Sequence, residues 1–305
     1  MALVRTDIPI TSKSCDRMIQ EIVEAYPFCR TEVITDTAYG RPVRTLVIGN
    51  GPRKVIYSAA HHANEWLTAT VLLKFIEDYA EALQNDTEIG GISARELYQN
   101  AAIHLVPLVN PDGVDLVTGA IEAGSEQYER AREFAEFYRN IPFPDGWKAN
   151  LNGVDLNLQY PAGWLRAREI KFSQGFTRPG PRDYVGRFPL SQPETQALYD
   201  YTERIDPAIV IAWHSQGEVI YWQYGGIEVP GARELAERFA QVSGYTLEDT
   251  PYNSSFAGYK DWFIQAFRRP GFTIEVGTGT NPLPVSQFGD IYRASLPILL
   301  EGAVG

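Results

Sequence analysis

Residues 54–66, KVIYSAAHHANEW, decide the fold class of this chain. The first six form a short, β-branched, apolar run, which favours a strand buried on both faces of a sheet. Helical periodicity begins directly after this stretch, over residues 66–82. A second continuous apolar run, AIVIAW at 208–213, repeats the strand signal far along the chain. Apolar strands that alternate with helices predict an α/β fold, with a twisted, mixed and mostly parallel sheet covered by helices on both faces.

The rest of the chain fits one α/β domain. Strands are expected at 32–36, 43–48, 101–109 and 272–276, and helices at 14–26, 125–139, 192–205, 233–242, 259–267 and 291–301. Residues 140–190 are rich in Gly, Pro and aromatic side chains and show little periodicity, and an irregular region of that length is usually functional. No break in composition divides the chain. We therefore predict a linker-like segment over residues 1–13 and a single domain over residues 14–305.

The bulk composition limits the partners and the location of the protein. A net charge of −11 argues against binding to nucleic acid, which needs a basic stripe. The first residues, MALVRTDIPITSKS, lack the apolar core of a signal peptide, and no run of about 18 apolar residues could span a membrane. We expect a cytoplasmic protein that does not bind membranes, or a domain excised from a longer chain.

The two cysteines, Cys15 and Cys29, flank the predicted helix at 14–26. A rise of about 1.5 Å per residue would separate them by roughly 15–20 Å, which is too far for a disulfide. We interpret them as inert thiols in a reducing compartment.

Four histidines are present, and three of them follow predicted buried strands. His61 and His62 come after the strand at 54–59, and His214 comes after the strand at 208–213. Ligands of open α/β sheets bind outside the carboxyl ends of the strands, so these positions suit a binding site. His104 lies within the strand at 101–109 and is expected to be a packed or edge residue.

A carboxylate three residues after His62 suggests a metal site. Catalytic zinc sites use three protein ligands and leave a fourth position for water. His62 and Glu65 would supply two ligands and His214 the third, although histidine is also an ordinary core residue. Glu275 lies in an apolar strand, where a carboxylate is costly unless it is paired or functional. It could be a salt-bridged strand residue or a general base with a pKa raised by burial, and the residues alone leave both open.

Several segments in order resemble the zinc carboxypeptidase family. They are HANEW at 62–66, NPDG at 110–113, GVDLN at 153–157, WHS at 213–215, DW at 261–262 and FTIEVGTG at 272–279. The resemblance covers nearly the whole chain and implies the family's α/β fold and a metallopeptidase activity. It implies that His62, Glu65 and His214 bind one Zn²⁺ ion and that Glu275 is the general base.

The resemblance also implies roles for residues around the metal. Asp155 would orient His62, although an aspartate in this context could instead cap a turn. Tyr252 would be a mobile tyrosine that closes over the substrate, with Tyr259 as the alternative residue for that role.

Departures from the family pattern concern recognition of the substrate. Where the family's exopeptidases have an Asn-Arg pair that binds the terminal carboxylate, this chain has Asn157 and Leu158, and leucine has no donor. Lys148 stands where a family arginine polarises the scissile carbonyl, and lysine keeps the charge without the planar fork. Lys260 stands at the base of the pocket for the residue beyond the scissile bond. A lysine there would favour a side chain with a carboxylate, unless Lys260 is an exposed helix residue.

The segments 153–164 and 172–186 resemble the γ-D-glutamyl–L-diamino-acid endopeptidase branch of the family. The resemblance implies hydrolysis of the γ-D-glutamyl–meso-diaminopimelate bond of peptidoglycan stem peptides. It also implies that a wall-binding LysM module, and with it association with the cell wall, is possible in a longer parent chain. A carboxypeptidase with an acidic or unusual C-terminal preference and a non-catalytic wall-peptide binding module are the alternatives. Five arginines could bind the carboxylates of a stem peptide or be solvated, and the sequence does not choose among them: Arg166, Arg168, Arg178, Arg182 and Arg187.

Overall fold

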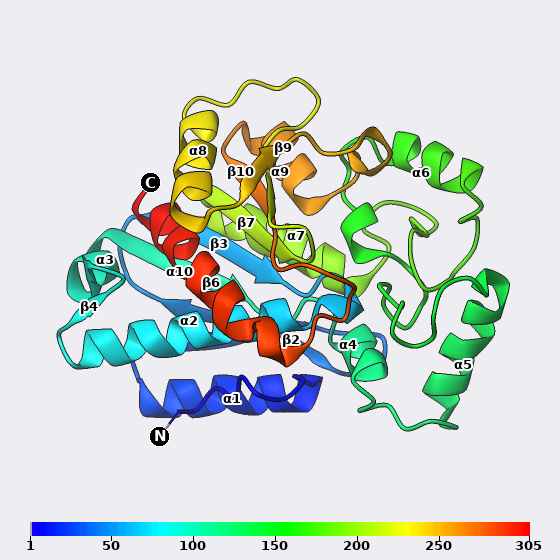
Figure 1. The fold of residues 1–305 in the computed structure, drawn as a ribbon, viewed down its shortest axis with the longest axis horizontal. Coiled ribbons are helices and arrows are strands. Elements are labelled where there is room, and N and C mark those ends of the chain that lie inside the picture. Colours follow the sequence, from blue (N-terminus) through cyan, green and yellow to red (C-terminus); the bar gives the residue numbers. More distant parts are fainter. Residues whose placement is uncertain (1) are drawn as a thin grey trace.

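The fold is built on an eight-stranded mixed sheet with the strand order β1-β2-β6-β3-β7-β10-β8-β9 (Figure 1). The structure is a computed structural model and describes residues 2–305. The four central strands β6, β3, β7 and β10 run parallel, whereas β1, β2 and β6 pair antiparallel, as do β10 and β8. The strands are β1 Arg30–Asp36, β2 Pro42–Ile48, β3 Arg53–Ala59, β6 Ala101–Val106, β7 Ile209–His214, β8 Val219–Tyr221, β9 Thr246–Glu248 and β10 Gly271–Glu275, and a separate hairpin joins β4 Glu88–Ile89 to β5 Ile92–Ser93.

Helices cover both faces of this sheet. In Figure 1, α2 and α10 cross in front of the sheet and α7 lies behind it. Successive residues of β3 point to opposite faces, so Tyr57 packs in the core under α2 and α10 while Ile56 packs in the core under α7 and α9. The helices are α1 Ser12–Ala25, α2 Leu67–Gln84, α3 Ala94–Asn100, α4 Pro111–Val117, α5 Glu126–Ala135, α6 Trp164–Ser173, α7 Pro193–Ile205, α8 Ala232–Ser243, α9 Tyr259–Phe267 and α10 Phe288–Val304.

The predicted α/β architecture is confirmed, and the differences are local. The region 140–190 is not wholly irregular, because α6 lies within it; its sequence WLRAREIKFS mixes apolar and charged residues without a clear stripe. The NPDG turn opens the short helix α4, whose N-cap is Asn110. The strands β8 and β9 have three residues each, which is too short for a sequence pattern to reveal.

The first residues lie against the domain. Val4 and Ile10 are buried in the main core, and the backbone N–H groups of Leu3 and Val4 donate to Glu77. Helix α1 then begins at Ser12, where the Thr11 and Ser14 side chains form a reciprocal cap. The division into residues 1–13 and 14–305 stays a prediction.

Three smaller expectations also have an outcome. Cys15 and Cys29 are buried free thiols, and burial raises the pKa of Cys29 to about 12, which is typical of an unreactive thiol. His104 is packed within β6 and its Nδ1 lies 2.7 Å from the Tyr201 hydroxyl. None of the helices among residues 2–305 combines the length and the apolar character that crossing a bilayer requires.

Candidate active site

The candidate site lies at the carboxyl edge of three neighbouring central strands. His214 is the last residue of β7 and Glu275 is the last residue of β10, and the two are directly paired in the parallel register. Ala59 ends β3, and the chain continues through His62 into the short 3₁₀ helix Ala63–Glu65. The sequence suggested that Glu275 lies within its strand. In the structure it is the last residue of β10. Parallel pairing alone brings together residues that are up to 213 positions apart.

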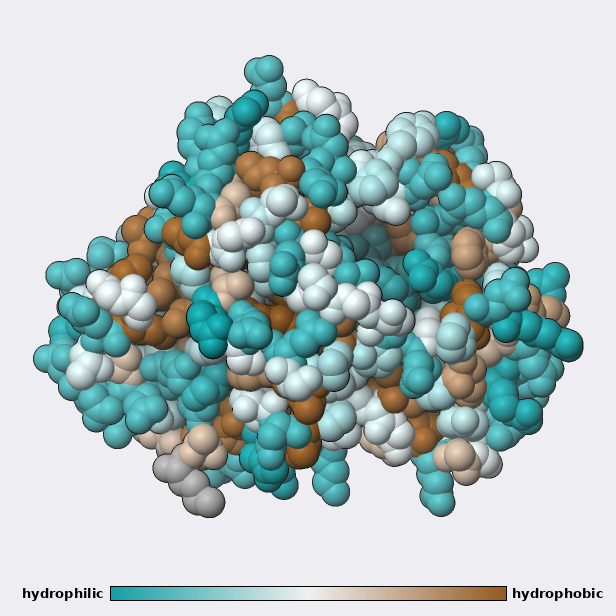
Figure 2. Space-filling model, viewed as in Figure 1, coloured by the Kyte–Doolittle hydropathy of each residue, from teal (hydrophilic) through white to brown (hydrophobic). Residues whose placement is uncertain are grey.

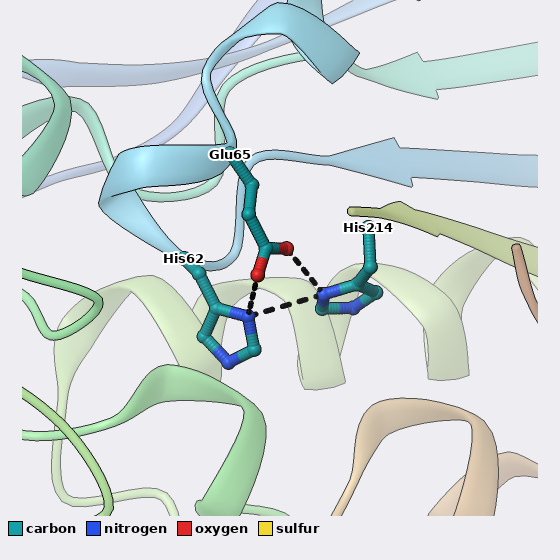
Figure 3. Close-up of side chains that lie close together, drawn as sticks. All are labelled: His62, Glu65 and His214. Atoms are coloured by element: carbon teal, nitrogen blue, oxygen red, sulfur yellow. Dashed lines mark hydrogen bonds and ion pairs between the residues drawn. The ribbon is translucent and has the colours of Figure 1, made fainter. Parts of the chain in front are cut away.

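His62, Glu65 and His214 converge on one point (Figure 3). The Nδ1 atom of His62 lies 2.9 Å from Glu65 Oε1, and the Nδ1 atom of His214 lies 2.9 Å from Glu65 Oε2. The two Nδ1 atoms are 3.2 Å apart. Glu65 and His214 are each about 1% exposed, so the cluster is closed on the side of the protein.

This arrangement fits a zinc ion. Ligand atoms about 2.0–2.1 Å from a tetrahedral zinc stand about 3.3 Å from one another, close to the separations found here. Two imidazole nitrogens that face each other beside a carboxylate form a donor set typical of metal sites. Histidines packed in a hydrophobic core would not bring these atoms together. The three predicted ligand residues are thus assembled by the fold.

Asp155 and Lys148 contact this cluster from the irregular region. Asp155 Oδ1 lies 3.2 Å from His62 Nε2 and also accepts from the backbone N–H of Asn157, so the same carboxylate caps a turn and holds the imidazole. This contact orients the opposite nitrogen, Nδ1, toward Glu65. Burial raises the pKa of Asp155, but His62 and Lys148 outweigh that effect and hold it well below its usual range. Lys148 Nζ donates to Glu65 Oε1 over 2.8 Å.

Glu275 faces the cluster without a partner of its own. Among residues 2–305 it forms no ion pair, so its interpretation as a salt-bridged strand residue is wrong. Burial, with a smaller effect from Glu65, raises the pKa of Glu275 to about 8, although Lys148 and His62 act in the opposite direction. A carboxylate with a raised pKa beside a metal site is suited to accept and return a proton.

Two cavities meet at these residues. The first, about 870 Å³ and partly open to solvent, runs from His62 and Glu275 to Lys260 and Asp261. The second, a hollow of about 1520 Å³ that includes space open to solvent, extends along Asn64, Asp145 and Gln216. Four residues line both cavities and mark their junction: Lys148, Arg182, Tyr221 and Glu275. Figure 2 shows that this face of the molecule is hollowed beside the part that carries α6, with largely hydrophilic side chains around the hollow.

The floor of the first cavity carries a buried ion pair. Lys260 Nζ donates to Asp261 Oδ1 over 2.6 Å and to the Gln223 carbonyl over 2.7 Å. Both Lys260 and Asp261 are under 5% exposed, so the interpretation of Lys260 as an exposed helix residue is wrong. Asn157 also lines this cavity, and its Oδ1 accepts from the Tyr259 backbone N–H. Leu158 is buried against Trp164 and offers the cavity no donor.

Neither tyrosine proposed as a lid lies over the metal ligands. Tyr252 is 59% exposed, and its hydroxyl accepts from Arg166 Nε and Nη2 over 3.1 and 2.9 Å. Thr250, which belongs to the same segment, lines the first cavity, but Tyr252 does not. Tyr259 is fully buried with its hydroxyl 2.8 Å from Thr202 Oγ1, so it is fixed in place.

Asn110, to which the sequence assigned no role in the site, connects two of its segments. The Asn110 side-chain amide donates to the carbonyls of His61, Lys148 and Ala149. It thereby ties the segment of His62 to the segment of Lys148. The asparagine of NPDG was visible as a turn residue, but its long-range partners were not.

The sequence of this chain matches a known family. The profile described as "Zinc carboxypeptidase" matches residues 15–296, so the chain belongs to the zinc carboxypeptidase family and is a metallopeptidase of that class. A curated relative, gamma-D-glutamyl-L-diamino acid endopeptidase 1 of Lysinibacillus sphaericus, is 44% identical over 93% of this chain and 69% of its own length. Murein peptide amidase A of Escherichia coli (strain K12) is 33% identical over 46% of this chain and 43% of its own length.

The solved structures agree on the fold. Thrombin-activatable fibrinolysis inhibitor has a TM-score of 0.76 to this chain, covers all of it, and is covered over 76% of its own chain. At 18% sequence identity, this likeness concerns the fold alone. The family implies zinc, which agrees with the donor set formed by His62, Glu65 and His214.

Proposed function

We propose that the protein hydrolyses the amide bond between γ-D-glutamate and meso-diaminopimelate in peptidoglycan stem peptides. The observation that carries this proposal is the Lys260–Asp261 ion pair at the floor of the cavity that begins at the metal ligands. The name of the Lysinibacillus sphaericus relative supports the same bond, and that of the Escherichia coli relative supports a murein peptide.

The ion pair is suited to bind a side chain that ends in both an ammonium and a carboxylate. An ammonium has three N–H donors, and two of those of Lys260 are taken by Asp261 and the Gln223 carbonyl. The third can donate to a carboxylate, while the carboxylate of Asp261 can accept from an ammonium. The side chain of diaminopimelate ends in both groups, whereas the side chain of lysine ends in an ammonium alone. The diamino acid would therefore occupy the first cavity and the glutamyl portion the second.

The chemistry follows from the residues at the junction. A zinc ion held by His62, Glu65 and His214 would act as a Lewis acid that activates water and polarises the scissile carbonyl. Glu275 accepts the proton of the attacking water and later delivers it to the leaving amine.

The neighbouring side chains orient the metal ligands and the substrate and stabilise the charge that develops during the reaction. Lys148 adds positive charge where negative charge develops on the carbonyl oxygen. Asp155 holds the His62 imidazole, and the Asn157 amide can donate to the substrate backbone. Tyr252 would have to leave Arg166 to close over the bound peptide. Residence in the cytoplasm and a LysM module in a longer parent chain stay predictions.

Mass analysis of digests tests this proposal directly. The protein is loaded with zinc and incubated with L-Ala-γ-D-Glu-meso-diaminopimelate and with peptides that end in acidic residues. Release of diaminopimelate and L-Ala-D-Glu supports the proposed bond, and a Glu275→Gln variant should not release them. Release of acidic C-terminal residues alone would instead support a carboxypeptidase. Binding of the stem peptide without any hydrolysis would support a binding module.

A further inference from the structure

Arg182 is the one member of the five arginines left open by the sequence that lines the catalytic cavities. Arg166, Arg168, Arg178 and Arg187 are exposed and line neither cavity. Arg182 lines both, together with Lys148 and Glu275, and its charge acts on the pKa of Lys148.

The backbone around Arg182 is fixed on both sides by segments of the site. The Pro181 carbonyl accepts from the backbone N–H groups of Lys148 and Ala149 over 2.7 and 2.9 Å. The Asp183 N–H donates to Asp155 Oδ2 over 3.2 Å. Asp183 has a φ of +64°, a left-handed conformation that is uncommon for a residue other than glycine.

The guanidinium has donors to spare. Its Nε donates to Asp183 Oδ2 over 2.6 Å, and among residues 2–305 Asp183 is its only hydrogen-bond partner. Four of its five N–H groups are therefore free to bind a ligand. Asp183 is also paired with Lys171 Nζ over 2.6 Å, so two cations share one carboxylate. Against the effect of burial, the charges of Asp155 and Glu65 also act on Arg182 and help to raise its pKa, but neither carboxylate forms a hydrogen bond with its guanidinium.

We propose that Arg182 binds the free carboxylate of the glutamyl residue whose γ-carboxyl forms the scissile bond. A γ-linked glutamate keeps its α-carboxylate four carbon–carbon bonds from the scissile carbonyl, a reach of about 5 Å. Among residues 2–305, two cations line the second cavity, which would hold the glutamyl portion: Lys148 and Arg182. Lys148 is tied to Glu65, so Arg182 remains for the substrate. Its planar fork can bind a carboxylate through two parallel hydrogen bonds.

The carboxylates of the leaving residue have other cations available. Lys260 and Lys171 both line the first cavity. The proposal rests on the proposed function, because it assumes a glutamyl–diaminopimelate substrate. It predicts that the protein discriminates a free glutamyl carboxylate from its amide, which has the same shape but no charge.

Two substrates that differ at this one group test the proposal. They are L-Ala-γ-D-Glu-meso-diaminopimelate and the same peptide with the glutamyl α-carboxylate converted to an amide. The wild-type kcat/KM should favour the free carboxylate by roughly 10- to 100-fold, the usual range for a charge-assisted hydrogen bond. Arg182→Ala should lose about that factor on the free carboxylate and change the amide by less than about threefold. Arg182→Lys should fall between the two, because it keeps the charge without the fork.

Arg178→Ala is the matched control from the same segment. The Arg178 side chain stacks on Phe137 and does not line either cavity, so this variant should behave as the wild type. An equal loss on both substrates in Arg182→Ala would overturn the proposal, because it would indicate that the residue merely positions Asp155 and Lys148. The proposal would also be overturned if Arg182→Ala instead lost its preference for a free α-carboxylate on the diaminopimelate residue, measured with a peptide in which that group is an amide.

Failure of the proposed function has a different signature. If the wild type cleaves neither peptide, the proposed function is wrong and the role of Arg182 falls with it. If the wild type cleaves both with a preference that Arg182→Ala does not alter, only the role of Arg182 is wrong.

Discussion

Glu194, a glutamate buried in the first turn of α7, is expected to make the stability of the fold decrease as the pH rises. Its side chain is 1% exposed, and its Oε1 accepts from Asn150 Nδ2 over 3.3 Å. Its Oε2 has no hydrogen-bond partner among residues 2–305. Burial, with a smaller contribution from the charge of Asp112, raises the pKa of Glu194 from 4.5 to about 7.

The sign and size of the effect follow from this pKa. The folded chain holds the proton more tightly than the unfolded chain does, so the stabilisation is fully present below about pH 4.5. It is lost as the pH rises through about 7. A change from 4.5 to about 7 corresponds to about 3 kcal/mol in the free energy of unfolding. Glu194→Gln removes the titration, so the wild type should lose about 3 kcal/mol more than the variant between about pH 4 and about pH 9.

Urea unfolding of the metal-free protein at several pH values measures this difference. Metal-free protein is used because zinc binding has a pH dependence of its own. Glu203→Gln is the control, since Glu203 is exposed at the far end of the same helix, and its curve should follow the wild type. Parallel pH profiles for the wild type and Glu194→Gln would refute the reasoning.

Three further predictions concern the catalytic site. Glu275→Gln should keep its zinc, as measured by elemental analysis, and lose roughly 10²- to 10⁴-fold in kcat; turnover near that of the wild type would exclude Glu275 as the base. Asp155→Asn should weaken zinc binding by about 10- to 100-fold in a chelator competition, because a neutral amide with a single accepting oxygen replaces the carboxylate whose two oxygens serve His62 and the Asp183 N–H; equal affinity would contradict the orienting role. Lys260→Met should lower kcat/KM by roughly 10- to 100-fold for a diaminopimelate substrate and less for its lysine analogue, which lacks the distal carboxylate; equal losses on the two would make Lys260 a bystander to this recognition.

The architecture could be predicted because strand and helix signals are local. Residues 55–57 of β3 and the run at 208–213 are apolar at every position, since both faces of their strands are covered by helices. The short strands β8 and β9 and the helix α6 escaped prediction because their partners, and not their own patterns, stabilise them. The position of the site could be predicted because parallel pairing brings the ends of strands together. The choice of His62, Glu65 and His214 as ligands followed from segments that resemble the zinc carboxypeptidase family.

The surroundings of the ligands depended on contacts between segments distant in sequence. The sequence left open whether Lys260 lies at the base of a pocket or is exposed on α9, and the fold buries it beside Asp261 and the Gln223 carbonyl. Tyr252 was expected over the substrate, yet Arg166 holds its hydroxyl outside the cavity.

The sequence by itself determined the reaction class, because the segments that carry His62, His214 and Glu275 occur in the order typical of the zinc carboxypeptidase family. Which cations face the substrate was decided only by the tertiary structure. Five arginines of similar local context stand between residues 166 and 187, and Arg182 alone reaches the cavities because Pro181 and Asp183 bind the segments of Lys148 and Asp155. The sequence specifies the identity of each side chain. Whether a charged side chain faces the cavity depends on backbone contacts between distant segments, which no local sequence pattern reveals.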